Sequence, residues 1–377
     1  MTIILLSKIL TMDFLLKSSL PPQAGYSLQK GDKKRKRMNI ISRKKPHYKP
    51  HKGLMGYLEN YNRVLDLPTT YGKLLEYDFA NALTDKAGRD TLWESVHYGP
   101  DKQPQIHTAL KNIYALLKTE GDTSVTEHLE VDRVDYCTFG NSKPFRIRII
   151  NRYNDNYDYF YVKQADASRI YGLELEHILS PNRIIYFMDG DTLIEEHIVG
   201  IPGDRFVAEY LDQPATNKIR IAKEFVKFNE RCFIRLLGDM RSYNYVVDAT
   251  QDFEATQYRI RAIDFDQQCY EGRKNLYLPQ FYKENLAFVN LTVEFLNPET
   301  ITQYQREERS LIAKRFKASR KRFERLMDAL EGDIISTPEK TLQLAKELAA
   351  HYNDEAFATA STMGELLRLS LHKLEKH

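Results

Sequence analysis

Hydrophobic and polar residues alternate with a period of two along residues 131–163. The segments VDYCTF, FRIRIINRY and DYFYVKQ carry this pattern, and the turn-forming sequences GNSKP and NDNY separate them. Because successive side chains of a strand point to opposite faces of a sheet, the pattern predicts three antiparallel strands. ASRIYGLELEHILS then predicts a helix, and Asp189-Gly190-Asp191 predicts the turn of a second strand pair, RIIYFMD and DTLIEEHIVG.

A spacing of three and four residues, typical of helices, flanks this unit on both sides. EYDFANAL and HTALKNIYALLK predict a helical extension over residues 54–128, and NKIRIAKEFVKFNERCFIRLL predicts a long helix after residue 215. YNYVVD and YRIRAIDF predict one more hairpin, and residues 280–377 are expected to be helical. The chain has no internal repeat, which excludes a solenoid. The expected fold class is therefore α+β.

The composition is that of a soluble globular protein, with 42% apolar and 28% charged residues among 377. The three cysteines lie far apart and form no Cys-x-x-Cys, which argues against a zinc site and against a disulfide-rich secreted domain. There is no His-Glu-x-x-His, and the nearest histidine pair, His47 and His51, lies in a basic, proline-containing stretch. We expect no protein-held zinc, and a reducing, cytoplasmic location.

Basic residues crowd into positions 30–52, which hold eleven Lys and Arg against one Asp. We interpret residues 1–53 as a solvated, disordered arm, with contact to an anionic membrane surface as the alternative. Nucleic acid is not an expected partner, because no groove-reading module accompanies the basic run. A further hypothesis is that translation begins at Met38, so that residues 1–37 are not part of the native protein. Such a start removes eight basic and two acidic residues and takes the formal charge from +3 to −3.

Polar residues with catalytic potential cluster after the predicted strands. In RLLGDMRSYNYVVD, Asp239 and Asn244 lie five positions apart, AIDFDQ places Asp264 behind the next strand, and Lys163 ends FYVK. Taken together with the order of the elements, these residues resemble the protein-kinase-like fold over about residues 131–290. The resemblance implies two lobes, a small antiparallel-sheet lobe followed by a mainly helical one.

The resemblance also implies a division of the whole chain. The expected parts are the basic arm, the helical extension, the kinase-like sheet lobe and the helical lobe with its catalytic and metal-binding loops, over residues 1–53, 54–128, 129–212 and 213–377.

In the sheet lobe, the resemblance implies that Lys163 holds the α- and β-phosphates of a nucleotide. Its ion-pair partner would come from the following helix, where Glu174 is preferred over Glu176; the two lie two positions apart, so only one can face the lysine. Backbone atoms near residues 195–199 would meet the adenine. The loop between the first two strands stands where kinases carry a glycine-rich loop, although an ordinary hairpin turn remains open. Its candidate phosphate-covering residues are Gly140, Ser142 and Lys143.

In the helical lobe, the resemblance assigns Asp239 as the base that accepts a proton from the acceptor hydroxyl. Arg241 would offset charge that grows on the transferred phosphoryl group. Asn244 and Asp264 would bind Mg²⁺, which takes hard oxygen ligands and keeps several waters. For Asp266, contact with a second metal and capping of the next segment both remain open.

The acceptor class follows from details of the catalytic loop. Gly238-Asp239 resembles aminoglycoside phosphotransferases and choline kinases, and IDFDQQCYEGRK is slightly similar to lipopolysaccharide-core sugar kinases. Leu237 stands where most relatives have His. We expect ATP and Mg²⁺ as cofactors and a small molecule, sugar or glycolipid hydroxyl as acceptor. The alternatives are a nucleotide-binding pseudokinase that acts as an interaction module, and a protein kinase.

Two further patterns are interpreted as packing. Residues 308–330 predict one amphipathic helix, and its basic side is either solvated or in contact with an anionic acceptor or membrane surface. Its predicted apolar face consists of Ile312, Phe316, Phe323, Leu326 and Leu330. The 24 tyrosines are scattered along the chain, which indicates packing and not a stacking platform for nucleic acid.

Overall fold

The computed structural model describes residues 45–85, 88–140, 142–252 and 256–376. The chain divides into two units, Met1–Lys45 and Pro46–His377, and everything below concerns the second. Most of the expected basic arm, and the hypothetical start at Met38, lie outside the described residues.

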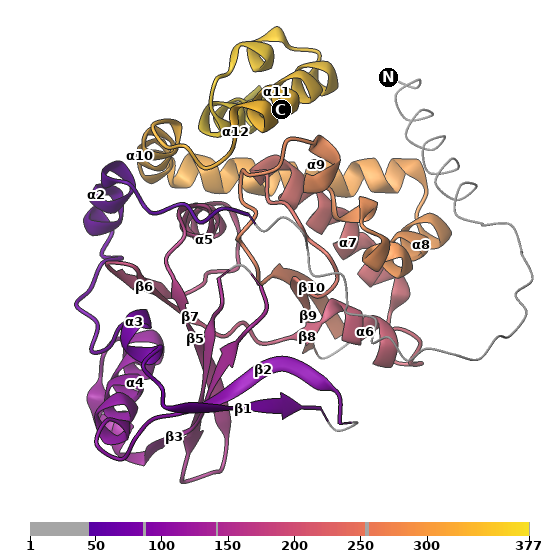
Figure 1. Cartoon of the computed structure of the whole chain (residues 1–377). Helices are drawn as coiled ribbons and strands as arrows, with labels where there is room; N and C mark the ends of the chain where they lie inside the picture. Colours follow the sequence, from indigo (N-terminus) through magenta and orange to yellow (C-terminus); the bar gives the residue numbers. More distant parts are fainter. Residues whose placement is uncertain (1–44, 86–87, 141, 253–255, 377) are drawn as a thin grey trace, which may run out of the picture. The chain divides into compact units, whose positions relative to one another are not determined.

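A seven-stranded antiparallel sheet with the order β1-β2-β3-β4-β5-β7-β6 forms one part of this unit (Figure 1). The three strands predicted from alternation are confirmed, as is the strand pair that turns at Gly190, whose φ of +52° suits glycine. The strands are β1 (Phe79–Thr84), β2 (Asp90–His97), β3 (Leu129–Cys137), β4 (Phe145–Asn151), β5 (Tyr157–Gln164), β6 (Tyr186–Asp189) and β7 (Thr192–Glu196).

The segment expected to be a helical extension is partly a sheet, so this prediction was wrong for EYDFANAL. That sequence ends in β1, which pairs with β2, and β2 pairs with β3. Its helix-like spacing is short, and pairing along β2 satisfies the backbone instead, with the rings of Phe79 and His97 stacked 4.6 Å apart. The other predicted helix is confirmed as α4 (Gln103–Lys118).

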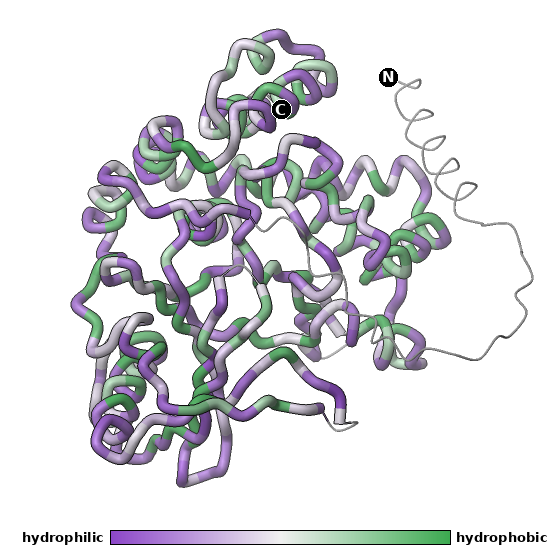
Figure 2. The backbone as a smooth tube through the Cα atoms, viewed as in Figure 1, coloured by the Kyte–Doolittle hydropathy of each residue, from purple (hydrophilic) through white to green (hydrophobic). Residues whose placement is uncertain are grey.

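Helices α3 (Tyr71–Leu74) and α4 lie against one face of the sheet (Figure 1). Hydrophobic residues recur along α4 among polar ones (Figure 2), and Ile113 is fully buried against this face. On β5, Phe160 and Val162 point into this core, so alternation sends Tyr161 and Lys163 to the opposite face. One strand therefore supplies both a core face and a polar face.

The stretch just before α2 (Lys52–Asn60) is ordered, which corrects the expectation of a disordered arm for residues 46–53. His47 Nε2 lies 2.7 Å from the carbonyl oxygen of Ala165, and the Tyr48 N–H donates to Asp166 at 3.0 Å. His51 caps α2 by accepting from the Gly53 N–H. These backbone and side-chain contacts fix the segment although its composition is basic and proline-containing.

Helices and a small second sheet of order β10-β9-β8 make up the rest. The predicted hairpin is confirmed, as is the helical character after residue 280. The elements are α5 (Ala167–Leu179), β8 (Ile201–Pro202), α6 (Gly203–Glu209), α7 (Lys218–Arg235), β9 (Tyr245–Gln251), β10 (Thr256–Ala262), α8 (Leu286–Phe295), α9 (Pro298–Ala318), α10 (Arg320–Glu331), α11 (Pro338–Tyr352) and α12 (Met363–His372).

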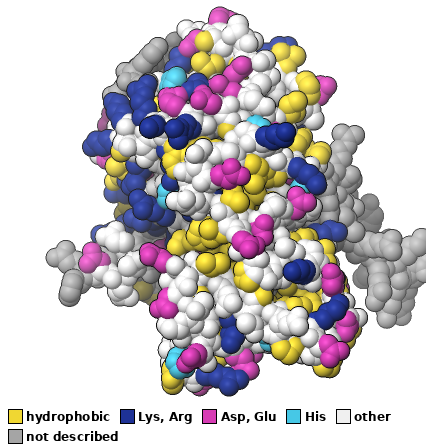
Figure 3. Space-filling view, turned by 90° about the vertical axis from the view of Figure 1, so that its left-hand side faces the viewer, with side chains coloured by type: hydrophobic (Ala, Val, Ile, Leu, Met, Phe, Trp, Pro, Cys, Tyr) yellow, Lys and Arg dark blue, Asp and Glu magenta, His cyan; other side chains and the backbone are white. Residues whose placement is uncertain are grey.

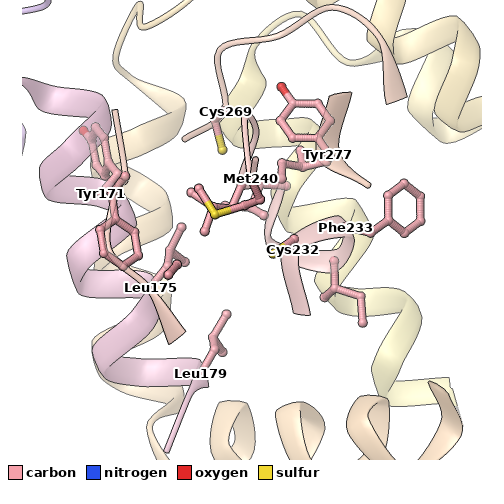
Figure 4. Close-up of a cluster of buried hydrophobic side chains, with 14 of the residues drawn as sticks. Tyr171, Leu175, Leu179, Cys232, Phe233, Met240, Cys269 and Tyr277 are labelled. Carbon is pink, nitrogen blue, oxygen red and sulfur yellow. The ribbon is translucent and has the colours of Figure 1, made fainter. Parts of the chain in front are cut away.

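A hydrophobic core joins α5, α7 and the loop that follows α7 (Figure 4). Leu175 of α5, Phe233 of α7 and Met240 of that loop are all buried in it. Because Met240 directly follows Asp239, this core anchors the loop on which a candidate catalytic residue lies.

The helix predicted over residues 308–330 is broken into α9 and α10, so a single continuous helix was wrong. The break falls at Ser319, a residue whose side chain competes for backbone hydrogen bonds, and its N–H donates to Arg315 and Phe316. The predicted apolar face is confirmed, since all five of its residues are buried. The break lets the rings of Phe316 and Phe323 meet edge to face, 4.6 Å apart.

The basic side of α10 is only partly solvated. Arg322 turns inward to Glu174, at 2.6 Å, while Arg320 is exposed and 3.9 Å from Glu324. On one face of the molecule Lys and Arg side chains gather toward the top, with Asp and Glu side chains among them (Figure 3). Part of the predicted basic surface thus serves internal ion pairing.

Replacing Ile113 by Ala should lower the free energy of unfolding by ~2–5 kcal/mol, because it opens a cavity between α4 and the sheet. Gln105→Ala, at an exposed position of the same helix, is the control and should stay within ~0.5 kcal/mol of wild type. Urea unfolding measures both. Equal midpoints for the two variants would contradict the packing of α4 on the sheet.

Candidate functional site

Lys163 is buried at the end of β5, on the polar face of the sheet, with 7% of its surface exposed. Its Nζ atom lies 2.9 Å from Oε2 of Glu195. The partner comes from the neighbouring strand, because Tyr161 pairs with Glu195 in the β5–β7 register and Lys163 is the next residue on the same face. Lys163 is therefore held by its own sheet.

The predicted partner of Lys163 on the helix was wrong. Glu174 is fully buried and faces α2 and α10: it accepts hydrogen bonds from Tyr57 at 2.5 Å and Tyr186 at 2.6 Å, and it pairs with Arg63 and Arg322. The other candidate, Glu176, pairs with Arg235 of α7. Neither carboxylate pairs with Lys163, because each is held by arginines of other elements.

Arg169, in the first turn of α5, occupies the place expected for a helix carboxylate. Its side chain is 2% exposed, its Nη2 atom lies 2.7 Å from Glu195 Oε2, and its Nη1 atom lies 3.1 Å from Asp264 and 2.9 Å from Asp266. The structure thus brings Lys163, Asp264 and Asp266 together through one guanidinium and one carboxylate.

Electrostatics in this cluster follow from burial and neighbouring charge. Burial acts to raise the pKa of Glu195, but the charges of Arg169 and Lys163 outweigh it and hold that pKa at about 2. Burial and the neighbouring Asp266 raise the pKa of Asp264 to about 6, against the opposing charge of Arg169. Asp264 still has 36% of its side chain exposed, so it is the carboxylate that a ligand can reach.

The loop after α7 brings the other predicted residues together. Asp239 Oδ1 lies 2.7 Å from Arg241 Nε, and Asn244 Nδ2 donates to the Asp239 carbonyl oxygen at 2.7 Å. Asp239 has a left-handed backbone with φ of +56°, which Asp tolerates better than most residues, and its N–H donates to the Tyr282 hydroxyl at 3.0 Å. Burial raises the pKa of Asp239 in spite of the Arg241 charge.

The base of the β9–β10 hairpin joins this loop to the Asp264 segment. The Ile263 N–H donates to the Asn244 carbonyl oxygen at 3.0 Å. Burial raises the pKa of Tyr243, and the charges of both Asp239 and Asp264 add to this rise. The hairpin therefore sets the two predicted halves of the site next to each other.

The loop between β3 and β4 lies away from the Lys163 side chain. Gly140 and Lys143 both have positive φ, +93° and +38°, and the Lys143 carbonyl oxygen accepts from Tyr71 of α3. Lys143 lines a pocket of about 640 Å³ with Gln164 and Thr192. Those two residues face α3, so the pocket opens on the side of the sheet opposite to the Lys163 side chain. Ser142 lies in the same turn, and residue 141 is outside the described residues.

Sequence reasoning missed three residues of the site. Alternation along β7 could have found Glu195, because Leu193 and Glu195 lie on the face opposite to Ile194, but the hairpin partner had to be known first. Arg169 gave no separate signal. Glu284 lies 2.8 Å from Arg241 Nη1, and its other oxygen is buried with no hydrogen-bond partner in the described part of the chain.

Tyrosines of β5 gather with basic residues on the polar face of the sheet. The Arg146 guanidinium lies 4.4 Å from the Trp93 ring and 5.3 Å from the Tyr159 ring, and Arg148 lies 4.2 Å over Tyr157. The fully buried Asp135 pairs with Arg146, which neutralises part of this basic surface.

The oxygen atoms that Asn244 and Asp264 offer suit Mg²⁺ better than Zn²⁺. Asn244 uses its amide nitrogen in the loop, which leaves its Oδ1 as an acceptor. Among the described residues, no group of three or more His, Cys, Asp or Glu side chains could hold a metal. One carboxylate, one amide oxygen and ligand phosphates suffice for Mg²⁺.

Comparison with known proteins does not show a family for this chain. No family model matches the chain, and no curated protein matches it either. Among the solved structures that match is "Titin kinase and its flanking domains", with 14% sequence identity and a TM-score of 0.26. The alignment covers 65% of this chain and 54% of that one, so about half of that protein's length is spanned.

In the described part of this chain, no helix is long and apolar enough to cross a membrane.

Arg169→Met should cost ~3–5 kcal/mol in the free energy of unfolding, because it leaves three carboxylates of the cluster without their shared cation. Arg205→Met, which removes an exposed i,i+4 pair with Glu209, is the matched control and should change stability little. Chemical unfolding at neutral pH measures both. Equal stability of the two variants would contradict the buried cluster.

A pH dependence follows from His177, whose ring nitrogens lie 3.3 Å from Arg63 and 3.1 Å from Arg322. Burial, then the charges of Arg322 and Arg63, lower its pKa from 6.5 to about 4. The unfolded chain binds more protons between these values, so the stability that His177 contributes above pH 6.5 is lost as the pH falls toward 4.

Between about pH 7 and about pH 4.5, wild type should therefore lose stability more steeply than His177→Gln, as measured by urea unfolding in steps of pH. Parallel slopes would mean that His177 is as basic in the folded protein as in the unfolded chain.

Proposed function

We propose that this protein is an ATP- and Mg²⁺-dependent phosphotransferase that acts on a hydroxyl of a small molecule, sugar or glycolipid, in the cytoplasm. The proposed architecture is a two-lobed, protein-kinase-like fold, with the seven-stranded sheet in one lobe and the helices with the small sheet in the other. The strand order β3-β4-β5-β7-β6, with α5 after β5, supports this architecture.

The observation that carries the proposal is the meeting of four predicted residues from three segments: the end of β5, the loop after α7 and the segment after β10. Lys163 and Asp264 share the Arg169–Glu195 cluster, and the Asp239–Asn244 loop is bonded to the Asp264 segment at the base of the hairpin. Lysine, carboxylate and amide groups at one place are what the positioning of a phosphorylated nucleotide requires.

In the proposed mechanism, the protein mainly positions groups and balances charge. Lys163 would contact nucleotide phosphates, while Asp264 and Asn244 would hold Mg²⁺, whose charge neutralises phosphate oxygens. Asp239 would orient the acceptor hydroxyl and take its proton, a role for which its raised pKa makes it a stronger base. Arg241, 2.7 Å from Asp239, would stabilise the charge on the phosphoryl group during transfer.

Thermal unfolding of the full chain with ATP, with and without Mg²⁺, tests the nucleotide site. We expect a magnesium-dependent rise of the midpoint in wild type, because a ligand that binds only the folded state stabilises it, and loss of that rise in Asp264→Asn. Asp248→Asn, on the same hairpin but away from the cluster, is the control and should keep the rise. Absence of any shift in wild type at millimolar ATP would refute the proposal.

Transfer itself is tested with Asp239→Asn. Release of ADP is measured across a panel of amino alcohols, sugars and glycolipids, and this variant should lose about 100-fold or more in turnover while its ATP-induced shift remains. Turnover retained at the wild-type rate would remove Asp239 from the mechanism.

A second candidate function is a nucleotide-binding pseudokinase that acts as an interaction module. One observation favours it: Arg169 already pairs with Asp264, the carboxylate proposed for the metal, and with the neighbouring Asp266. This function predicts an ATP-induced shift without ADP release for every member of the panel.

A further inference from the structure

Lys163 and its counter-ion belong to the same sheet, and a second cation joins them from α5. This inference rests on the proposed nucleotide site. We propose that Glu195 is the positioning residue that aims both Lys163 and Arg169 at the phosphates of the nucleotide, so that the helix supplies a cation and the sheet supplies the carboxylate.

The geometry of the sheet supports this role. Glu195 is 4% exposed, and its Oε2 atom lies 2.9 Å from Lys163 Nζ and 2.7 Å from Arg169 Nη2. Charge-assisted hydrogen bonds of this kind fix the position of a long, flexible side chain. Because β5 and β7 are paired strands, both residues of the Lys163–Glu195 contact belong to one sheet.

The charges of the cluster point to a ligand with both metal and phosphate. Two cations, Lys163 and Arg169, meet three carboxylates, of which Asp264 is the most exposed. A divalent cation on Asp264 would leave the cluster positive, and the phosphates of a nucleotide would then restore the balance. A metal or a phosphate alone fits this set of charges less well.

The rival carboxylate is already neutralised elsewhere. Glu174 is shared by Arg63 and Arg322, and both of its oxygens also accept from tyrosine hydroxyls. No acceptor capacity of Glu174 is directed toward β5, so it does not compete for Lys163.

The first arm of the test needs no nucleotide. Melting temperatures are compared for wild type, Lys163→Met, Glu195→Gln and their double variant, with Glu196→Gln and its double variant with Lys163→Met as matched controls. Glu196 is the next residue of β7 and faces Lys118 on the other side of the sheet. We expect the losses of Lys163→Met and Glu195→Gln to be clearly less than additive, and those of Lys163→Met and Glu196→Gln to add.

The second arm separates phosphate contact from base contact. Calorimetric titration with MgADP and with adenosine should give about tenfold or more weaker MgADP binding for Glu195→Gln, with adenosine affinity unchanged. Glu196→Gln changes only a side chain on the other face of the sheet and leaves the backbone of residues 195–199 in place, so it should change either affinity by less than about twofold. A merely structural role of Glu195 would weaken both ligands together.

Three results would overturn the inference. The first is additive losses for Lys163 and Glu195, and the second is an unchanged MgADP affinity in Glu195→Gln. The third is wild-type protein that binds neither ligand, which refutes the proposed function and with it the phosphate role. Less-than-additive losses in that case would still establish the Lys163–Glu195 pair by itself.

Discussion

A single buried carboxylate, Glu195, connects the parts of the candidate site. A charge that is removed from water needs partners close by, and Glu195 finds Lys163 on its own sheet and Arg169 on α5. Arg169 in turn reaches the segment after β10 through Asp264 and Asp266. Sheet, helix and loop are therefore fixed relative to one another by charge, in a place where hydrophobic packing alone would leave the polar side chains free to turn.

The loop of Asp239 depends on a different kind of support. Its backbone is held by the Tyr282 hydroxyl and the Asn244 side chain, and Met240 anchors it in the core between α5 and α7. The packing of Met240 and the hydrogen bonds of the loop together keep Asp239 in a left-handed conformation that a free chain would rarely adopt. The Asp239 loop and the Glu195 cluster are thus stabilised by different interactions, and they meet at the base of the β9–β10 hairpin.

The sequence predicted those features whose cause is local. Alternation found β3, β4 and β5, and a strong turn found the β6–β7 pair, because side-chain period and turn chemistry act within a few residues. β1 escaped notice because its pairing with β2 is a matter of tertiary context, and the break at Ser319 leaves the apolar spacing intact on both of its sides. Spacing placed Asp239, Asn244 and Asp264 on adjoining loops, since a hairpin returns the chain to its starting point.

The ion-pair partners of charged side chains could not be predicted from the local sequence. Periodicity states that Glu174 and Glu176 point in different directions, but it does not say which elements will lie on either side of α5. Only the positions of α2, α7 and α10 decide that Glu174 meets Arg63 and Arg322, that Glu176 meets Arg235, and that neither meets Lys163. An ion pair between distant segments is a product of the fold and leaves no mark on the spacing of either segment.

The environment of Glu174 has a consequence for how the chain folds as it is made. Its partners come from α2, from β6 and, through Arg322, from a helix that begins at residue 320. A nascent chain that has reached only the end of the sheet lacks Arg322, one of the two cations that compensate this buried carboxylate. The pairing of Glu174 is therefore complete only when α10 is in place, so the early and late parts of the chain depend on each other for their final packing.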